Sequence, residues 1–182
     1  MIADHTIKEI AELIGTHNPP VPAGGTTLAI DGLLGVALLQ LSFKVSKKEW
    51  REGVKRKFSN YPDRFTQAEE LFGNTITDDV TAFKTNQEEG FKDKDKLKTI
   101  IEVPLKAALE AKEMIILSDK LKEHIKSSVK ADYKVARINL RACIKAAVEI
   151  ITSNYQFFAA DDDFIVKTKK EIDQLKDFIE KY

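Results

Sequence analysis

The first residues whose types could bind a ligand form a short turn, Gly24-Gly25-Thr26-Thr27, just ahead of a long apolar stretch. Backbone N–H groups at the start of a helix point outward and favour a carboxylate or a phosphate. The turn lacks the lysine and the spacing of a phosphate-binding P-loop. Two interpretations stay open: a ligand-binding turn, or a structural turn with a threonine as helix cap.

The histidines and the cysteine indicate little further chemistry. His5, His17 and His124 are far apart, with no second histidine or cysteine at ligand spacing, so the sequence predicts no zinc site. Cys143 lies among apolar helix residues and is expected in the core. Because it is the only cysteine, no intramolecular disulfide is possible, which fits a reducing compartment. No serine, histidine and aspartate order indicates a hydrolase triad.

A central helix must position whatever site this chain has. From Leu28 to Phe43 the only polar residues are Asp31, Gln40 and Ser42, so we expect neighbours on every side of this helix. The apolar run is short for a membrane span, and Asp31 would be costly in lipid, so we expect no membrane partner. Ala29, Gly32 and Gly35 recur every third residue and predict close approach of another backbone, from this chain or from a second copy.

The remaining apolar residues recur every three or four positions, which is typical of helices. Thr6 and Glu9 have capping-box spacing ahead of a helix on which Ile7, Ile10 and Ile14 share a face, and Gly15 ends that helix. Further helices are predicted over about 63–89, over 100–125 with Pro104 inside, from Ser127 or Ser128 to about 160, and after Asp161. The third of these should bury its apolar positions, which are Val135, Ile138, Ala142, Ala146 and Ile150. The sequence therefore predicts an all-α fold: one domain over residues 1–182, an up-and-down bundle of about five or six helices around a buried central helix.

Charge and composition restrict the partners. The chain has 29 basic and 29 acidic residues, so no overall field attracts nucleic acid or an anionic membrane, and anion binding must be local. The first ten residues lack a basic region followed by an apolar run, so we expect no signal peptide. These features favour a cytoplasmic protein.

Four separated pieces resemble the cyclodeaminase/cyclohydrolase family of folate enzymes. The first, PPVPAGGTTLAIDGLLGVALLQLSFKVSKK, is similar to the family's proline–glycine turn, small-residue helix and lysine-pair ending. The second is Asp79-Val-Thr-Ala-Phe83, similar to Asp-x-x-Ala-Phe, and the third is Glu102-Val-Pro-Leu105. The fourth is Asp132 with Val135 and Ala136, followed by Asn154. The pieces occur in family order and cover most of the chain.

The resemblance implies chemistry on a one-carbon unit held between N5 and N10 of tetrahydrofolate. A cyclodeaminase closes formiminotetrahydrofolate to the methenyl form and releases ammonia, whereas a cyclohydrolase opens the methenyl form with water to 10-formyltetrahydrofolate. Both reactions pass through cationic intermediates, which a fixed carboxylate could stabilise while it moves protons. No metal and no cofactor beyond the tetrahydrofolate substrate is implied, and a homodimer is expected.

The resemblance implies Asp79 as the first catalytic carboxylate and Asp132 as the second. Phe83 follows Asp79 by one helical turn and could line a pterin pocket. The alternatives are a solvated pair, Asp78 and Asp79, and a dipole-stabilising Asp132 in the first turn of a helix. Gly24, Gly25, Thr26 and Thr27 would contribute to substrate binding.

Two further residues have alternative roles. Lys48, with Lys47, would hold the glutamate tail of folate, or would form only a solvated helix end. Asn154 would hydrogen-bond either a pterin edge or a neighbouring helix backbone.

Departures from the family pattern motivate an alternative hypothesis for the function. Ala23 replaces a glycine, Lys126 and Ala131 replace an asparagine and a serine near Asp132, and Ile150 replaces an asparagine. The alternative to a folate enzyme is therefore a non-catalytic binding or assembly protein with the same fold.

Overall fold

The structure is a computed structural model that describes residues 2–16, 22–159 and 162–181. His17, Pro19, Pro20 and Asp161, which the sequence patterns involve, lie outside these residues. Among the described residues there are helices and no strands, in agreement with the predicted all-α fold. In chain order the helices are η1 (Ile2–Asp4), α1 (Ile7–Gly15), α2 (Gly24–Lys47), α3 (Glu52–Lys57), α4 (Tyr61–Glu88), α5 (Lys94–Leu121), η2 (Lys122–His124), η3 (Ser127–Val129), α6 (Lys130–Asn154), η4 (Tyr155–Phe157) and α7 (Asp163–Lys181).

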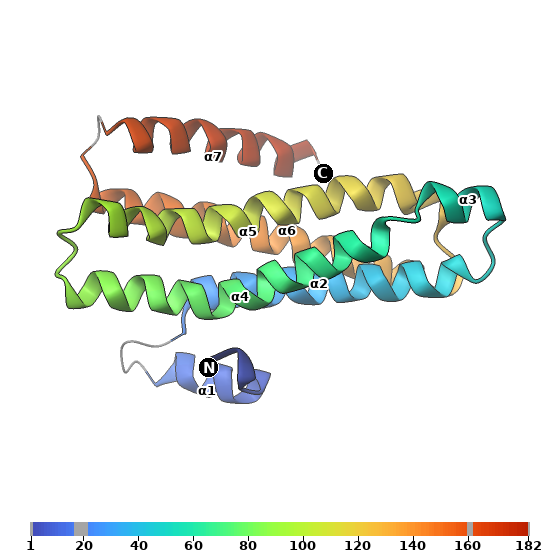
Figure 1. The fold of residues 1–182 in the computed structure, drawn as a ribbon, viewed down its shortest axis with the longest axis horizontal. Coiled ribbons are helices and arrows are strands. Elements are labelled where there is room, and N and C mark those ends of the chain that lie inside the picture. Colours follow the sequence, from blue (N-terminus) through green and yellow to red (C-terminus); the bar gives the residue numbers. More distant parts are fainter. Residues whose placement is uncertain (1, 17–21, 160–161, 182) are drawn as a thin grey trace.

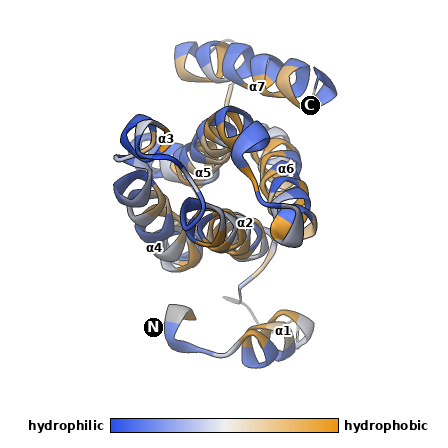
Figure 2. Cartoon of the chain, turned by 90° about the vertical axis from the view of Figure 1, so that its right-hand side faces the viewer, coloured by the Kyte–Doolittle hydropathy of each residue, from blue (hydrophilic) through white to orange (hydrophobic). Residues whose placement is uncertain are grey.

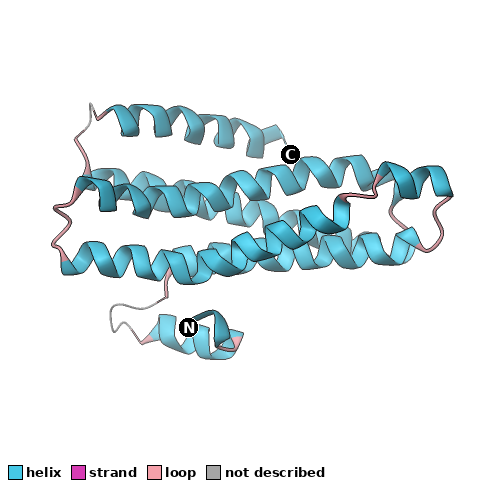
Figure 3. Cartoon of the chain, viewed as in Figure 1, coloured by secondary structure: helices cyan, strands magenta, loops and turns pink. Residues whose placement is uncertain are grey.

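Four long helices, α2, α4, α5 and α6, form an up-and-down bundle (Figures 1 and 3). In the end-on view, α7 lies outside α5 and α6, and α1 lies on the opposite side of the bundle (Figure 2). Helix α2 packs against α4, α5 and α6, so the predicted central helix is confirmed. Helices α2 and α6 run antiparallel, because Gly24 lies beside Ile150 whereas Gly35 lies beside Leu140.

The small residues of α2 allow the predicted close packing within one chain. A Cβ on Gly32 would overlap the ring of Phe72 on α4. A Cβ on Gly35 would lie 2.8 Å from Cγ of Leu140 and 3.1 Å from the carbonyl oxygen of Ala136, both on α6. Both glycines therefore permit a helix contact that a larger residue would push apart.

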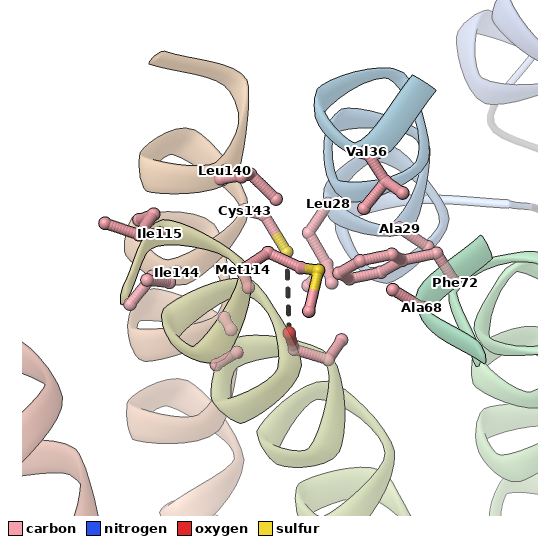
Figure 4. Packing of buried hydrophobic residues seen from close by; sticks show 14 of the residues in the cluster. Leu28, Ala29, Val36, Ala68, Phe72, Met114, Ile115, Leu140, Cys143 and Ile144 are labelled. Atoms are coloured by element: carbon pink, nitrogen blue, oxygen red, sulfur yellow. Dashed lines mark hydrogen bonds between the residues drawn. The ribbon is translucent and has the colours of Figure 1, made fainter. Parts of the chain in front are cut away.

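The interior between these helices is largely apolar, and Figure 4 shows part of it around Phe72, Met114 and Cys143. Cys143 is fully buried, and its thiol lies 4.0 Å from the carbonyl oxygen of Ala107. Burial raises the pKa of this thiol, so the expectation of a core cysteine is confirmed and a reactive thiolate is disfavoured.

One side of α2 departs from the prediction of complete burial. Leu34 and Leu41 are 41% and 44% exposed, and on α6 Val135 and Ile138, predicted inside the bundle, are 44% and 62% exposed. Neighbouring helices cover α2 on the side of α4, α5 and α6 and leave its remaining side uncovered. Apolar composition signals that a helix needs neighbours, but it does not show that one chain supplies all of them.

Helix ends agree with the sequence where a local signal exists. The Thr6–Glu9 capping box is present, and α1 ends at Gly15. Helix α6 begins at Lys130, after the 3-10 turn Ser127–Val129, and ends at Asn154, so the predicted serine cap and the end near residue 160 are wrong. Ser127 and Ser128 belong to that turn instead of capping the helix.

Helix α2 is longer than its apolar run. Over Gly24–Lys47 it has the length and composition of a helix that could cross a membrane. A core helix passes the same test, and the packing of Gly32 and Gly35 against α4 and α6 accounts for its apolar character on those sides.

Candidate functional site

The carboxylate of Asp79, on α4, lies directly against the first turn of α2. A Cβ added to Gly25 would overlap this carboxylate, so only glycine allows the observed approach. The backbone N–H of Thr26 donates a hydrogen bond to Asp79. The glycine turn and the sequence-predicted acid, which are more than fifty residues apart, are thus brought together.

The environment of Asp79 raises the pKa of its carboxyl toward neutral pH. Burial raises the pKa of its carboxyl to about 6, and the hydrogen bond from the Thr26 N–H opposes part of that rise. The neighbouring Asp78 is exposed and borders a separate groove between α4 and α5. The interpretation of two equivalent solvated carboxylates therefore holds for Asp78 and fails for Asp79.

The start of α2 leaves polar groups available beside Asp79. Its N-cap position is Ala23, which supplies no side-chain cap, so the predicted threonine cap is absent. Thr27 instead donates its hydroxyl to the carbonyl oxygen of Ala23 at 3.0 Å. Thr26 is fully buried, and its Oγ1 has no hydrogen-bond partner among the described residues. Unsatisfied donors at a helix start, together with an unpaired buried hydroxyl, are suited to a polar ligand.

Phe83 lies one turn beyond Asp79 and remains 42% exposed. Its ring meets that of Phe91 at a centroid distance of 5.7 Å, and Phe91 stacks on Phe157 at 4.5 Å. The sequence analysis did not identify Phe91 or Phe157. No spacing rule links them to Phe83, because Phe91 comes from a turn and Phe157 from η4, the 3-10 helix that follows α6.

Asn154 has one of its two proposed roles in this structure. Its side-chain amide donates to the carbonyl oxygen of Ile100 on α5 at 2.9 Å. The amide therefore ties the end of α6 to α5. Ile150, one turn earlier on α6, packs beside Gly24.

Asp132 and Lys48 lie at the other end of the bundle from Asp79. Asp132 is in the first turn of α6, whereas the α6 residue beside Gly24 is Ile150. At a rise of about 1.5 Å per residue, Asp132 and Ile150 are roughly 27 Å apart, and Lys48 is roughly 36 Å from Gly24. Within one chain Asp132 and Lys48 are therefore remote from the Asp79 site, because antiparallel helices of this length separate their ends.

Comparison with solved structures supports the fold. The chain is similar to a formiminotetrahydrofolate cyclodeaminase from Thermotoga maritima, with a TM-score of 0.89 and 18% sequence identity over 99% of this chain and 92% of that one. No curated protein sequence matches the chain. The sequence profile named formiminotransferase-cyclodeaminase matches residues 6–174, nearly the whole length. The chain therefore belongs to the formiminotransferase-cyclodeaminase family.

Proposed function

We propose that this protein is a folate one-carbon enzyme, either a formiminotetrahydrofolate cyclodeaminase or a methenyltetrahydrofolate cyclohydrolase, that works as a homodimer. The observation that carries the proposal is the half-buried Asp79 against Gly25, with its pKa raised to about 6. Such a group holds a proton in part of the population at neutral pH and can both donate and accept one. Membership of the family supplies the folate class of substrate.

In the cyclodeaminase reaction, N10 attacks the formimino carbon on N5 and forms a C–N bond, and the proton that N10 carried passes to the formimino nitrogen. Protonated Asp79 donates a second proton to that nitrogen, the bond from carbon to that nitrogen breaks, and ammonia leaves a methenyl cation. The Asp79 carboxylate, ionised by this transfer, then stabilises the cation electrostatically.

In the cyclohydrolase reaction, water adds to the methenyl carbon while Asp79 accepts a proton from it. The bond from that carbon to N5 then breaks, the proton is returned to N5, and the one-carbon unit remains on N10 as a formyl group. The second proton of the water is released to solvent. The same carboxylate therefore serves either reaction.

The first turn of α2 would orient the substrate. We assign Gly24, Gly25, Thr26 and Thr27 to substrate binding, since the Thr26 N–H donates to Asp79 and the buried Thr26 hydroxyl has no partner among the described residues. Phe83 offers an exposed ring one turn along α4 for a flat pteridine. Asn154 has its amide engaged with α5, and we assign it to positioning α6.

A homodimer would supply the proposed residues that one chain leaves distant. The exposed side chains Leu34, Leu41, Val135 and Ile138 form what we call the α2/α6 stripe. Gly35 of α2 lies against Ala136 of α6, and the exposed residues Leu34 and Val135 each come one position earlier. Because the two helices are antiparallel, both exposed residues lie on the same side of that contact.

The charge distribution favours an antiparallel arrangement of the two copies. Residues 44–64, near the end of α2, have eight basic and three acidic residues. Residues 69–95, which include Asp79, have eight acidic and three basic residues. A twofold axis across the stripe would place these opposite charges side by side, with Lys48 and Asp132 of one copy toward the Asp79 end of the other.

The test follows the loss of the near-ultraviolet absorption of 5,10-methenyltetrahydrofolate, and separately ammonia release from formiminotetrahydrofolate. Asp79→Asn should lower turnover by about 10²- to 10⁴-fold, because the proton carrier is removed while a hydrogen-bond acceptor for Thr26 remains. Asp78→Asn, which makes the same change one residue away, should keep wild-type turnover.

Ammonia release would identify a cyclodeaminase, and methenyl hydrolysis alone a cyclohydrolase. Wild-type protein that accelerates neither reaction would support the non-catalytic alternative. Equal turnover in wild type and Asp79→Asn would overturn the assignment of the catalytic carboxylate.

A further inference from the structure

A second concave site lies at the end of the bundle remote from Asp79. Where α2 ends, the chain turns through α3 and returns into α4, leaving a groove of about 560 Å³. We call it the basic groove, and its lining residues are Gln40, Phe43, Lys44, Lys47, Lys48, Lys55, Pro62, Phe65 and Thr66. None of its lining residues belongs to the first turn of α2 or to the Asp79 region of the same chain.

The floor of the basic groove is rigid and aromatic. Phe43 and Phe65 are almost fully buried and meet edge to face at 5.6 Å between ring centroids. Tyr61 stacks on Phe43 at 6.1 Å, and Trp50 meets the other side of Phe43 at 5.2 Å. Packing fixes these side chains, and little of either phenylalanine is exposed, so a bound ring would contact mainly Pro62 and the lysine stems above this floor.

The walls carry four lysines and no carboxylate. Lys47 places its ammonium 5.6 Å from the ring centroid of Phe43, and Lys44 is held at 3.0 Å by the side-chain oxygen of Gln40. These ammonium groups are thus positioned by neutral partners, and their charge stays available for an anion.

Nearby acidic residues compensate little of this charge. Glu52 pairs with Lys55 at 2.7 Å but is 74% exposed, where an ion pair is weak. Glu49 pairs with Lys126, which does not line the groove. Residues 44–64 keep a net charge of +5, from eight basic and three acidic residues, in a chain whose overall charge is zero.

From this arrangement we propose that the basic groove binds a flat ring that carries a polyphosphate, as in a nucleoside polyphosphate. The lining cations are all lysines, which bind phosphates as compact point charges, whereas planar carboxylates are matched better by the forked guanidinium of arginine. Pro62, the lysine stems and the aromatic floor would contact the ring. Within one chain the groove is remote from Asp79, and in the proposed dimer Lys48 is the residue that it shares with the folate site. The proposed reaction itself does not require a ligand in the groove.

The chain contains its own reporter for the test. Trp50 is the only tryptophan and touches Phe43 of the floor, so its fluorescence should change when the groove fills. The probe is ATP with a chelator present, titrated with excitation at the red edge of tryptophan absorption. We expect saturable binding that weakens as salt rises.

Lys44→Glu/Lys47→Glu should lower the affinity for ATP by at least about tenfold, since two favourable charges become repulsive. The matched control is Lys167→Glu/Lys170→Glu, the same charge change at two exposed positions of α7, which should stay within about twofold. Circular dichroism verifies that both variants keep their helices.

Absence of saturable ATP binding, or an equal loss of affinity in the two double variants, would overturn the proposal. Two competitors test the chemical class. Tripolyphosphate should compete more weakly than ATP, because it lacks the ring, and 5-formyltetrahydrofolate, a ring with carboxylates, should also compete more weakly. If either matches ATP, the assignment to a ring-bearing polyphosphate is wrong.

Discussion

At the scale of single residues, the surroundings of Asp79 matter most for the proposed function. A carboxyl beside the first turn of a helix normally ionises readily, because the N–H groups there favour negative charge. Here burial outweighs that effect, and the pKa is raised to about 6 although the Thr26 N–H donates to the carboxylate. Gly25 allows the Asp79 carboxylate to lie this close to α2, since a side chain at position 25 would overlap the carboxylate and displace it.

The raised pKa of Asp79 predicts a pH-dependent cost in stability. The folded protein binds this proton more tightly than the unfolded chain, so the free energy of unfolding should fall as pH rises from about 4 through about 6. Asp79→Asn removes the ionisable group without removing an acceptor for Thr26. Its stability relative to wild type should therefore rise between pH 4 and pH 7.5, by at most about 3 kcal/mol for a shift of roughly two pKa units.

Chemical unfolding of both proteins at the two pH values measures this difference. Asp78→Asn serves as the control, because Asp78 is exposed and its replacement should leave the pH dependence of wild type intact. If the stability difference between Asp79→Asn and wild type is the same at pH 4 and pH 7.5, the carboxyl is not desolvated.

At the scale of helices, α2 determines how closely the bundle can pack. Gly32 and Gly35 lower the intrinsic helix stability of α2, by about 1 kcal/mol each relative to alanine. Because these two positions carry no side chain, Phe72 and Leu140 can pack close to the backbone of α2 and complete the core. Gly73 on α4 is a contrasting case, because no heavy atom lies within 4 Å of a Cβ placed there.

Two glycine-to-alanine changes should therefore act in opposite directions. Gly73→Ala should raise the free energy of unfolding by about 0.5–1 kcal/mol, since it lowers the backbone entropy of the unfolded chain at a helix position with room for a methyl group. Gly32→Ala should lower it by about 1–3 kcal/mol, because the new methyl group overlaps the buried Phe72 ring. Thermal or urea unfolding followed by circular dichroism gives both values, and a stabilising Gly32→Ala would show that Phe72 can move aside.

The sequence is informative where a signal is local. The Thr6–Glu9 capping box and the Gly15 end are encoded within a few residues, and both are confirmed. The apolar period located the long helices, and the small-residue pattern located the tight contacts of α2. The placement of Asp132 and Lys48 depends instead on how long antiparallel helices set their ends apart, which no short motif records. The exposure of Ile138 likewise depends on which neighbours one chain can supply.

At the scale of the whole molecule, a second copy of the chain would complement three features of the first. The α2/α6 stripe exposes apolar side chains, residues 44–64 are basic, and residues 69–95 are acidic by the same margin. Exposed leucine and isoleucine lose water favourably when covered, at roughly 25 cal/mol per Å² of apolar surface. A second copy placed antiparallel across the stripe satisfies all three features with one symmetric contact.

This arrangement makes the dimer testable apart from the chemistry. Leu34→Glu/Ile138→Glu places two like charges on each copy of the stripe, so light scattering after size exclusion should show twice the mass of one chain for wild type and a single chain for the variant. Val166→Glu, on α7 and also 44% exposed in wild type, should remain dimeric. If Lys48 and Asp132 reach the Asp79 site only from a second copy, the monomeric variant should also lose turnover while it keeps its helical circular dichroism. A variant that stays dimeric would place the contact elsewhere, and a fully active monomer would show that one chain completes the site, with no role for Lys48 or Asp132 from across the axis.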